Sequence, residues 1–295
     1  MVILCKSNTS NVKNSIMMTI NRRRYMDNKD LYRECLSFKA LRSGTFTLTI
    51  GSDVSTTNLE YIEYSLDEGK TWFKTDNVNG ETVVITTPTI DQDEVVYWKG
   101  KGLRMSTSNA TDATKYSRFT ATANFEASGN IMSLLYEKWN KATSVNTYAF
   151  AYLFYNNTRI KTAPEFPATT VAAQCYNNTF RGCTNLVTGP SILPALTLAS
   201  NCYGNTFRGC TSLVTAPILP AKNLVSNCYI YMFRDCSSLN YIKALFTTTP
   251  SSTYTSAWVQ GVSSSGTFVK NSAATWTNTG VSSVPSGWTV ETASE

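Results

Sequence analysis

Tyrosine and arginine recur together in the second half of this 295-residue chain. Three times a tyrosine is followed five residues later by an arginine: Tyr176 and Arg181, Tyr203 and Arg208, and Tyr229 and Arg234. Aromatic rings stack on sugar faces, and the guanidinium group forms forked hydrogen bonds with anionic groups. The spacing therefore predicts rows of side chains that bind a glycan. The alternative is that the tyrosines are half-buried filler and the arginines form a solvated edge.

Catalytic chemistry has few candidate residues in this chain. The sequence contains no histidine, which is the most common general base and the most common metal ligand. No pair of carboxylates stands out as the acid and base of a glycan hydrolase. We therefore expect a protein that is not an enzyme and that uses neither a cofactor nor a metal ion.

The tyrosine and arginine pairs belong to a repeated unit of 26 or 27 residues. The stretch "NNTFRGCTNLVT" at 177–188 returns as "GNTFRGCTSLVT" at 204–215. A weaker unit precedes them, with Phe154, Asn157, Ile160, Pro164 and Pro167 at the corresponding positions. This period lies within the range of leucine-rich repeats, whose units stack because one unit alone cannot bury its apolar face. The pattern predicts a short solenoid with Phe180, Phe207 and Phe233 in line. In each unit we expect a short strand at "LVTAP" and a helical or 3₁₀ turn at "LASNCYGNTF" on the opposite face.

Six of the eight cysteines lie at two positions of this unit. They are Cys175, Cys202 and Cys228, each followed eight residues later by Cys183, Cys210 and Cys236. Pairing within each unit would give three disulfides. However, Asn157 stands where Cys183 stands one unit later, and Asn and Cys interchange where a small side chain is buried against the next coil. We therefore expect buried free thiols rather than disulfides. A zinc site is disfavoured because these cysteines form no C-x-x-C pair.

The segment "CYGNTFRGCTSLVTAPILPA", 202–221, resembles the BspA-like leucine-rich repeats of gut Bacteroidales and of their crAss-like or related phages. The resemblance covers about 149–246. The tail "GTFVKNSAATWTNTGVSSVPSGWTV", 266–290, is similar to the C-terminal cap that follows such repeats, which implies a β-rich cap over 247–295. The resemblance implies a role in adhesion or display, either on a phage virion or on a bacterial cell surface.

Residues 36–124 alternate between apolar and polar side chains, as in "TFTLTI" and "TVVIT", and turn clusters separate these runs. Such a pattern predicts an antiparallel, immunoglobulin-like β-sandwich. The stretch "SLDEGKTW", 65–72, resembles the Asp-box hairpin of sialidases, with Asp67 capping the turn, Gly69 in a left-handed conformation and Trp72 anchoring the loop. A single copy without an arginine cluster predicts a structural role.

The segment 125–148 separates the sandwich from the repeats. Ile131, Leu134, Leu135 and Trp139 recur there at helical spacing after Ser128 and Gly129. This predicts one amphipathic helix that caps the first repeat, because an open end of stacked repeats exposes its core. The chain as a whole is therefore expected to be mainly β with short helices.

The N-terminal 35 residues hold seven Lys or Arg against three Asp or Glu, although the net charge of the whole chain is only +6. We expect this segment to form a basic arm around Arg22, Arg23, Arg24 and Tyr25, and "INRRRYM" resembles the N-termini of phage virion proteins. The arm would dock on other virion proteins; the alternative is a solvated tail. Because the excess charge is local, we expect no nucleic-acid partner.

The function predicted from these features is display on a phage virion as a head or tail fibre or decoration. The repeats would bind the host surface, and analogy with fibres suggests a homotrimer. The opening residues lack the apolar run of a secretory signal, and no stretch approaches the roughly 18 apolar residues of a membrane span. We therefore expect synthesis in the host cytoplasm and no membrane span. The alternative is a bacterial BspA-type cell-surface adhesin, which would need an export signal.

Overall fold

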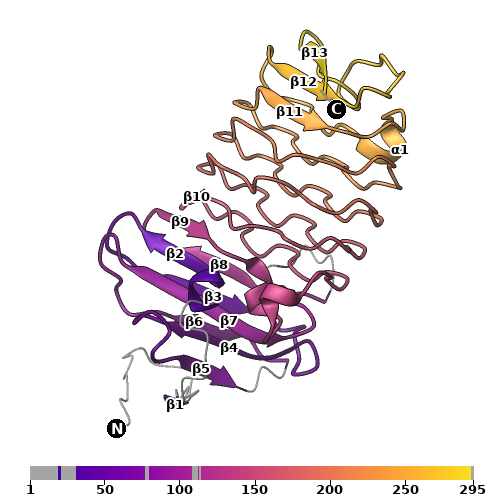
Figure 1. The fold of residues 1–295 in the computed structure, drawn as a ribbon. Coiled ribbons are helices and arrows are strands. Elements are labelled where there is room, and N and C mark those ends of the chain that lie inside the picture. The colour runs from indigo at the N-terminus through magenta and orange to yellow at the C-terminus, as the bar shows by residue number, and fades with distance from the viewer. Residues whose placement is uncertain (1–18, 21–30, 77–79, 108–111, 113, 294–295) are drawn as a thin grey trace.

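A computed structural model describes residues 19–20, 31–76, 80–107, 112 and 114–293. The described chain is mainly β, with several sheets and only short helices. In Figure 1 the N-terminal sheets lie at one end of an elongated body, and successive turns of the remaining chain stack away from them toward the C-terminus. Arg22, Arg23, Arg24 and Tyr25 lie outside the described residues.

Two sheets form the N-terminal part. The larger sheet has the order β1 (Thr19–Ile20), β5 (Phe73–Asp76), β4 (Leu59–Ser65), β7 (Val95–Gly102), β2 (Leu36–Ala40), β9 (Phe125–Ser128) and β10 (Ile160–Thr162). The smaller sheet has the order β6 (Val83–Thr86), β3 (Phe46–Ile50) and β8 (Arg118–Ala121). All neighbours are antiparallel except β9 and β10, which are parallel.

Aromatic side chains fill the space between the two sheets. The ring centroid of Phe38 on β2 lies 5.3 Å from that of Phe46 on β3 and 4.9 Å from that of Phe119 on β8. Burial alternates along β3, because successive side chains of a strand point to opposite faces. The expected period-two pattern is therefore confirmed, and these rings hold the two sheets together.

The segment predicted as a helical linker, 125–148, begins with strand β9 and contains two 3₁₀ helices, η2 (Ile131–Leu134) and η3 (Trp139–Lys141). The four apolar residues at helical spacing are buried as expected, but the prediction of one amphipathic helix is wrong. The side chain of Asn130 caps η2 by accepting from the N–H of Met132 at 2.8 Å. The N–H of Leu135 then bonds back to Met132 O at 3.0 Å, which closes the turn after one 3₁₀ helix.

The N-terminal sheets themselves cover the first repeat. The N–H of Phe119 on β8 donates to Leu153 O at 2.7 Å, and the N–H of Met105 donates to Ala149 O at 2.7 Å. Helix η2 packs instead on the larger sheet, where Ser133 Oγ donates to Trp98 O at 2.8 Å. The expected lid is therefore supplied by strands rather than by a helix.

The fold also begins earlier than the predicted end of the arm at residue 35. Helix η1 (Leu31–Glu34) precedes Cys35, which is fully buried and forms a parallel bridge with Asn130. Residues 31–35 therefore belong to the folded body.

One side of each repeat is a run of turns with a left-handed residue at every fourth position. In the second unit these residues are Gln174, Asn178 and Gly182. Backbone N–H groups bond alternately within the unit and to the next unit: Phe180 N donates to Thr206 O at 2.8 Å, whereas Cys183 N donates to Phe180 O at 3.0 Å. Buried backbone groups must find such partners. This run of turns replaces the helical or 3₁₀ turn expected on this face. The strand expected at "LVTAP" forms in the first unit as β10 and in the last unit as β11 (Tyr241–Ala244), but in the two middle units it reduces to isolated bridges such as Thr188 with Thr215.

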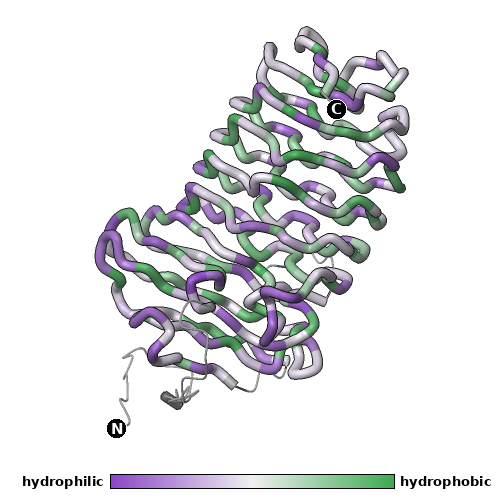
Figure 2. The backbone as a smooth tube through the Cα atoms, in the orientation of Figure 1, coloured by the Kyte–Doolittle hydropathy of each residue, from purple (hydrophilic) through white to green (hydrophobic). Residues whose placement is uncertain are grey.

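Aromatic rings align from unit to unit inside this stack. The centroid of Phe207 lies 5.6 Å from that of Phe180 and 5.8 Å from that of Phe233, with nearly parallel planes. Figure 2 shows hydrophobic segments recurring along successive turns of the chain. The prediction that the phenylalanines of consecutive units lie in line is confirmed.

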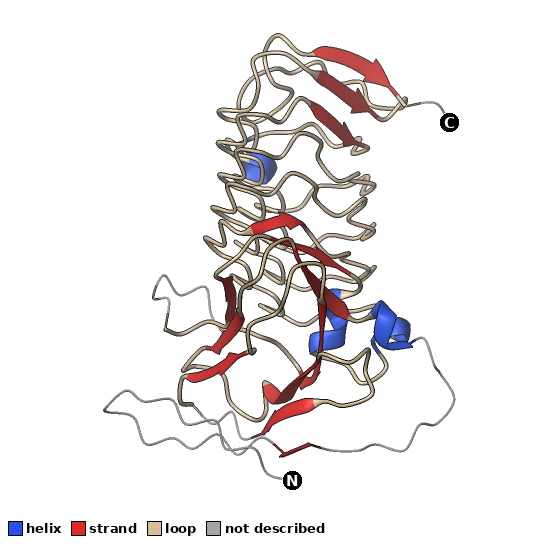
Figure 3. Ribbon diagram, turned by 90° about the vertical axis from the view of Figure 1, so that its left-hand side faces the viewer, coloured by secondary structure: helices blue, strands red, loops and turns tan. Residues whose placement is uncertain are grey.

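The C-terminal residues 247–293 extend the stack. Strands β11 (Tyr241–Ala244), β12 (Thr267–Lys270) and β13 (Thr289–Thr292) are parallel neighbours, and Figure 3 shows them at the end far from the N-terminal sheets. Helix α1 (Ser252–Thr255) precedes Trp258, whose ring lies 5.9 Å from that of Phe233 and prolongs the aromatic core. Paired residues of β11 and β12 are 26 positions apart, as in the repeats, such as Tyr241 and Thr267, whereas those of β12 and β13 are 22 apart, such as Thr267 and Thr289.

Candidate functional site

The three tyrosines predicted to bind a glycan lie in the core. Tyr176, Tyr203 and Tyr229 are 0%, 1% and 1% exposed, and their rings stack on one another. Burial raises the pKa of all three well above the ordinary range. These rings cannot contact a ligand, so this part of the prediction is wrong. The physical reason is that each tyrosine directly follows a buried cysteine and lies on the side of the turns that faces the core.

The three arginines form a row on the outer side of the same turns. Arg181, Arg208 and Arg234 follow the stacked phenylalanines directly and are partly exposed. Their backbones are in register, because Gly182 N donates to Arg208 O and Gly209 N donates to Arg234 O, both at 2.8 Å. We call these three side chains the arginine row.

Neighbouring side chains hold the guanidinium groups in place. Arg181 Nη1 donates to Asn178 Oδ1 at 3.3 Å, and Arg208 Nη1 donates to Asn205 Oδ1 at 3.5 Å. The guanidinium carbon of Arg181 lies 5.7 Å from the ring centroid of Tyr155. Those of Arg208 and Arg234 lie 5.6 and 5.4 Å from the ring of Tyr231. Such cation–π contacts orient the charged groups without neutralising them.

Sequence reasoning missed these supporting residues. Tyr155 stands at the arginine position of the first unit, and Tyr231 stands where Asn178 and Asn205 stand in the units before it. Both could have been found by aligning every position of the unit rather than the most repetitive ones.

One carboxylate interrupts the arginine row. Asp235 Oδ2 lies 3.6 Å from Arg234 Nε and 3.9 Å from Arg208 Nε. Partial burial lowers the pKa of Arg208, and the positive charges of Arg181 and Arg234 lower it further, whereas Asp235 opposes this shift. The row is therefore a set of mutually repelling cations with one internal counterion.

The second cysteine of each unit donates its thiol to a backbone carbonyl of the preceding unit. Cys183 Sγ lies 3.0 Å from Phe154 O, Cys210 Sγ lies 3.1 Å from Phe180 O and Cys236 Sγ lies 3.0 Å from Phe207 O. Asn157 Nδ2 makes the equivalent bond to Phe119 O at 3.0 Å. All seven described cysteines are free and buried, as expected. The second cysteine of each unit faces the preceding unit rather than the next, whereas the thiols of Cys175 and Cys228, at the first position, donate to carbonyls of the next unit. Cys5 lies outside the described residues.

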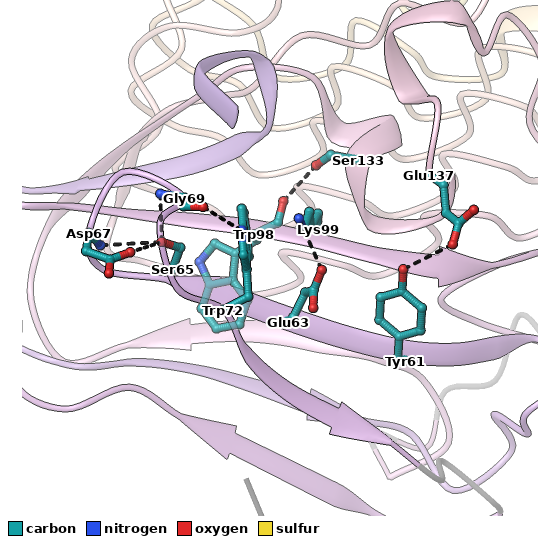
Figure 4. A network of polar contacts seen from close by, with 10 residues as sticks. All are labelled: Tyr61, Glu63, Ser65, Asp67, Gly69, Trp72, Trp98, Lys99, Ser133 and Glu137. Atoms are coloured by element: carbon teal, nitrogen blue, oxygen red, sulfur yellow. Dashed lines mark hydrogen bonds and ion pairs between the residues drawn. The ribbon is translucent and has the colours of Figure 1, made fainter. Parts of the chain in front are cut away.

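The Asp-box loop has the expected geometry (Figure 4). Asp67 accepts hydrogen bonds from Thr71 N at 2.8 Å and from Thr71 Oγ1 at 2.7 Å. Gly69 has φ of +76°, and Trp72 is buried with its indole N–H donating to Gly69 O at 3.0 Å. These contacts hold the hairpin between β4 and β5 and confirm the predicted turn.

A buried ion pair lies beside this loop on the larger sheet (Figure 4). Lys99 Nζ is 3.2 Å from Glu63 Oε1 and 3.6 Å from the ring centroid of Trp72. The side chains of Lys99 and Glu63 are only 18% and 6% exposed. Because the partner of Glu63 is a lysine rather than a second carboxylate, this pair does not form the acid and base of a glycosidase.

Within the described ranges, no group of three His, Cys, Asp or Glu side chains is placed to hold a metal ion. The same ranges contain no helix with the length and apolar character needed to cross a membrane. Comparison of the chain with protein-family models, with curated proteins and with solved structures gave no match.

Proposed function

We propose that this protein is a non-enzymatic attachment protein whose arginine row binds glycans on a host surface. The observation that carries the proposal is the recurrence of one oriented, partly exposed arginine in each of three stacked units. A repeating ligand suits a repeating surface, because each unit can offer the same contact to successive groups of a polymer.

We propose further that the stacked units are a BspA-like leucine-rich-repeat solenoid. The repeat length, the aligned rings of Phe154, Phe180 and Phe207, and the thiol ladder support this assignment. The two N-terminal sheets then serve as an immunoglobulin-like β-sandwich that begins the stack and holds it away from its anchor.

We place the protein on a phage virion, as a head or tail fibre or decoration. Support comes from the likeness of the repeats and of "INRRRYM" to proteins of such phages, and the trimeric state is proposed by analogy with fibres. In this proposal Arg22, Arg23, Arg24 and Tyr25 dock on other virion proteins. Changing the three arginines of the arm together to alanine should prevent incorporation into particles, as measured by mass spectrometry of purified virions. Normal incorporation would contradict arm docking, and recovery of the natural protein in a bacterial cell-surface fraction would favour the adhesin alternative.

Attachment can be tested with the purified full chain and gut Bacteroidales cells. Replacing Arg181, Arg208 and Arg234 with alanine should reduce the bound protein, measured by flow cytometry. The matched control replaces Lys161, Lys222 and Lys243 with alanine. These lysines lie outside the arginine row, and their replacement removes the same number of positive charges. Equal binding by the two triple variants and the natural protein would refute a role for the row in attachment.

A further inference from the structure

The arginine row contains its own example of a bound carboxylate. Asp235 places one carboxylate oxygen within 4.0 Å of the Nε atoms of arginines from two consecutive units, Arg208 and Arg234. The gap between neighbouring arginines of the row therefore has the dimensions and charge to receive a carboxylate group. The side chain of Asp235 is 55% exposed, so this gap opens to solvent.

The preceding gap, between Arg181 and Arg208, has the same framework, but none of the residues that the structure describes places a carboxylate there. Gly209 stands one residue after Arg208, as Asp235 stands one residue after Arg234, and both residues are left-handed, with φ of +74° and +64°. Each also donates its N–H to the next unit, Gly209 to Arg234 O and Asp235 to Gln260 O. A glycine supplies no carboxylate, so Arg181 has no ion pair among the described residues, and Arg208 is paired only on the side of Arg234.

We propose that the gap between Arg181 and Arg208, beside Gly209, binds a carboxylate of an acidic polysaccharide. This inference rests on the proposed attachment function and specifies its ligand as a polyuronate. Two features favour a sugar acid over a neutral sugar. First, Tyr176, Tyr203 and Tyr229 are buried, and the partly exposed Tyr155 and Tyr231 already contact guanidinium groups of the row. Second, the recurring partly exposed groups of the row are cations, two of them held by Asn178 and Asn205.

A uronate group would relieve the mutual repulsion of the arginines, as Asp235 does in the next gap. Binding should weaken as salt increases, since partly exposed charges are screened.

The structure supplies a test with matched variants at one position. Gly209→Asp would place an internal carboxylate in the gap, whereas Gly209→Asn imposes the same backbone conformation without the charge. A Cβ atom at Gly209 meets its nearest neighbour, in Gly182, at 3.7 Å, and Asp235 shows that aspartate occupies this conformation. Both variants should therefore fold, which circular dichroism and urea unfolding would verify.

Binding would be measured by isothermal titration of the full chain with oligogalacturonate at low salt. We expect Gly209→Asp to weaken binding about tenfold or more, as loss of one close charge pair does, and Gly209→Asn to retain it. Asp235→Asn, which frees the second gap, should strengthen binding. Neutral dextran should not bind.

Three results would overturn the inference: no binding of oligogalacturonate by the natural protein, equal losses in the two Gly209 variants, or tighter binding of single-stranded DNA of the same charge. If oligogalacturonate does not bind but the arginine variant still loses attachment to cells, the proposed attachment function stands and only the choice of ligand is wrong.

Discussion

Alkaline pH should unfold this protein because its thiols are buried. Burial raises the pKa of Cys35, Cys202 and Cys236 to about 12 and that of Cys228 to about 11. It also raises the pKa values of the other described cysteines, Cys175, Cys183 and Cys210. In the unfolded chain these groups ionise near their ordinary value of 9.0. A group whose pKa is raised by folding stabilises the fold fully below its unfolded pKa, and this contribution is lost as pH rises toward the folded pKa.

The loss can be estimated from the number of thiols. At pH 10 each buried thiol lowers the free energy of unfolding by about 1.4 kcal/mol, because the thiol ionises in the unfolded chain and pH 10 lies one unit above its unfolded pKa. The seven free cysteines together then remove about 10 kcal/mol, which is comparable to the whole stability of a typical domain. We therefore expect the free energy of unfolding to fall steeply between pH 8 and pH 10. Above pH 10 the buried tyrosines should add to the loss, because burial raises their pKa values too.

The assay is urea unfolding under reducing conditions, followed by tryptophan fluorescence at several pH values. A control variant carries Cys175→Ala, Cys202→Ala and Cys228→Ala, because the first unit has a buried alanine, Ala149, at this position. Four described thiols remain in this variant, so its free energy of unfolding should fall by about 6 kcal/mol at pH 10 rather than by about 10 kcal/mol. The reasoning is refuted if the natural protein has the same stability at pH 8 and pH 10. It is also refuted if the variant loses as much as the natural protein.

Three further substitutions test the stack and the Asp-box loop, each by urea unfolding at neutral pH. Phe207→Ala should lower the free energy of unfolding by about 3–5 kcal/mol, because it leaves a cavity between the rings of Phe180 and Phe233. A loss below about 1 kcal/mol would contradict a continuous core. Tyr203→Phe should leave stability unchanged or raise it, since no described residue hydrogen-bonds to the buried hydroxyl and Phe150 stands at this position in the first unit. A clear loss of stability would reveal a partner for that hydroxyl. Asp67→Ala should cost about 2 kcal/mol by removing the acceptor of two bonds from Thr71. Burial raises the pKa of Asp67, but those bonds lower it to below its ordinary value, so the difference between variant and natural protein should disappear as pH falls through the folded pKa. A difference that persists in acid would contradict this account.

The repeat period was sufficient to predict the aligned rings and the buried thiols. Each of these features depends on which residues recur, and recurrence is visible in the sequence. The exposure of an individual side chain is different, because it depends on the direction that the turn gives it. Tyr203 and Arg208 recur equally well, yet one lies in the core and the other partly in solvent. Repetition alone could not separate them, so the predicted tyrosine row was wrong while the arginine row remains a candidate.

Helical spacing misled for a related reason. The apolar residues from Ile131 to Trp139 are all buried, so the pattern correctly marked a core-facing segment. However, a periodicity in burial does not determine whether backbone bonds span three residues or four. Here the side chain of Asn130 caps the start of η2, and the Leu135 N–H bonds to Met132 O three residues back, where η2 ends.

Asn157 explains how two differently built parts form one body. In later units the equivalent cysteine donates to a carbonyl of the unit before it, but the first unit has strands β8 and β9 in front of it instead of a repeat. The longer amide side chain of asparagine reaches Phe119 O on β8, and the aromatic stack continues through Phe154 to Phe119, whose ring centroids lie 5.5 Å apart. Strands β8 and β9 thus present to the first repeat the same carbonyl and ring that a preceding repeat would present. The N-terminal sheets can therefore close this end of the stack without a separate capping helix.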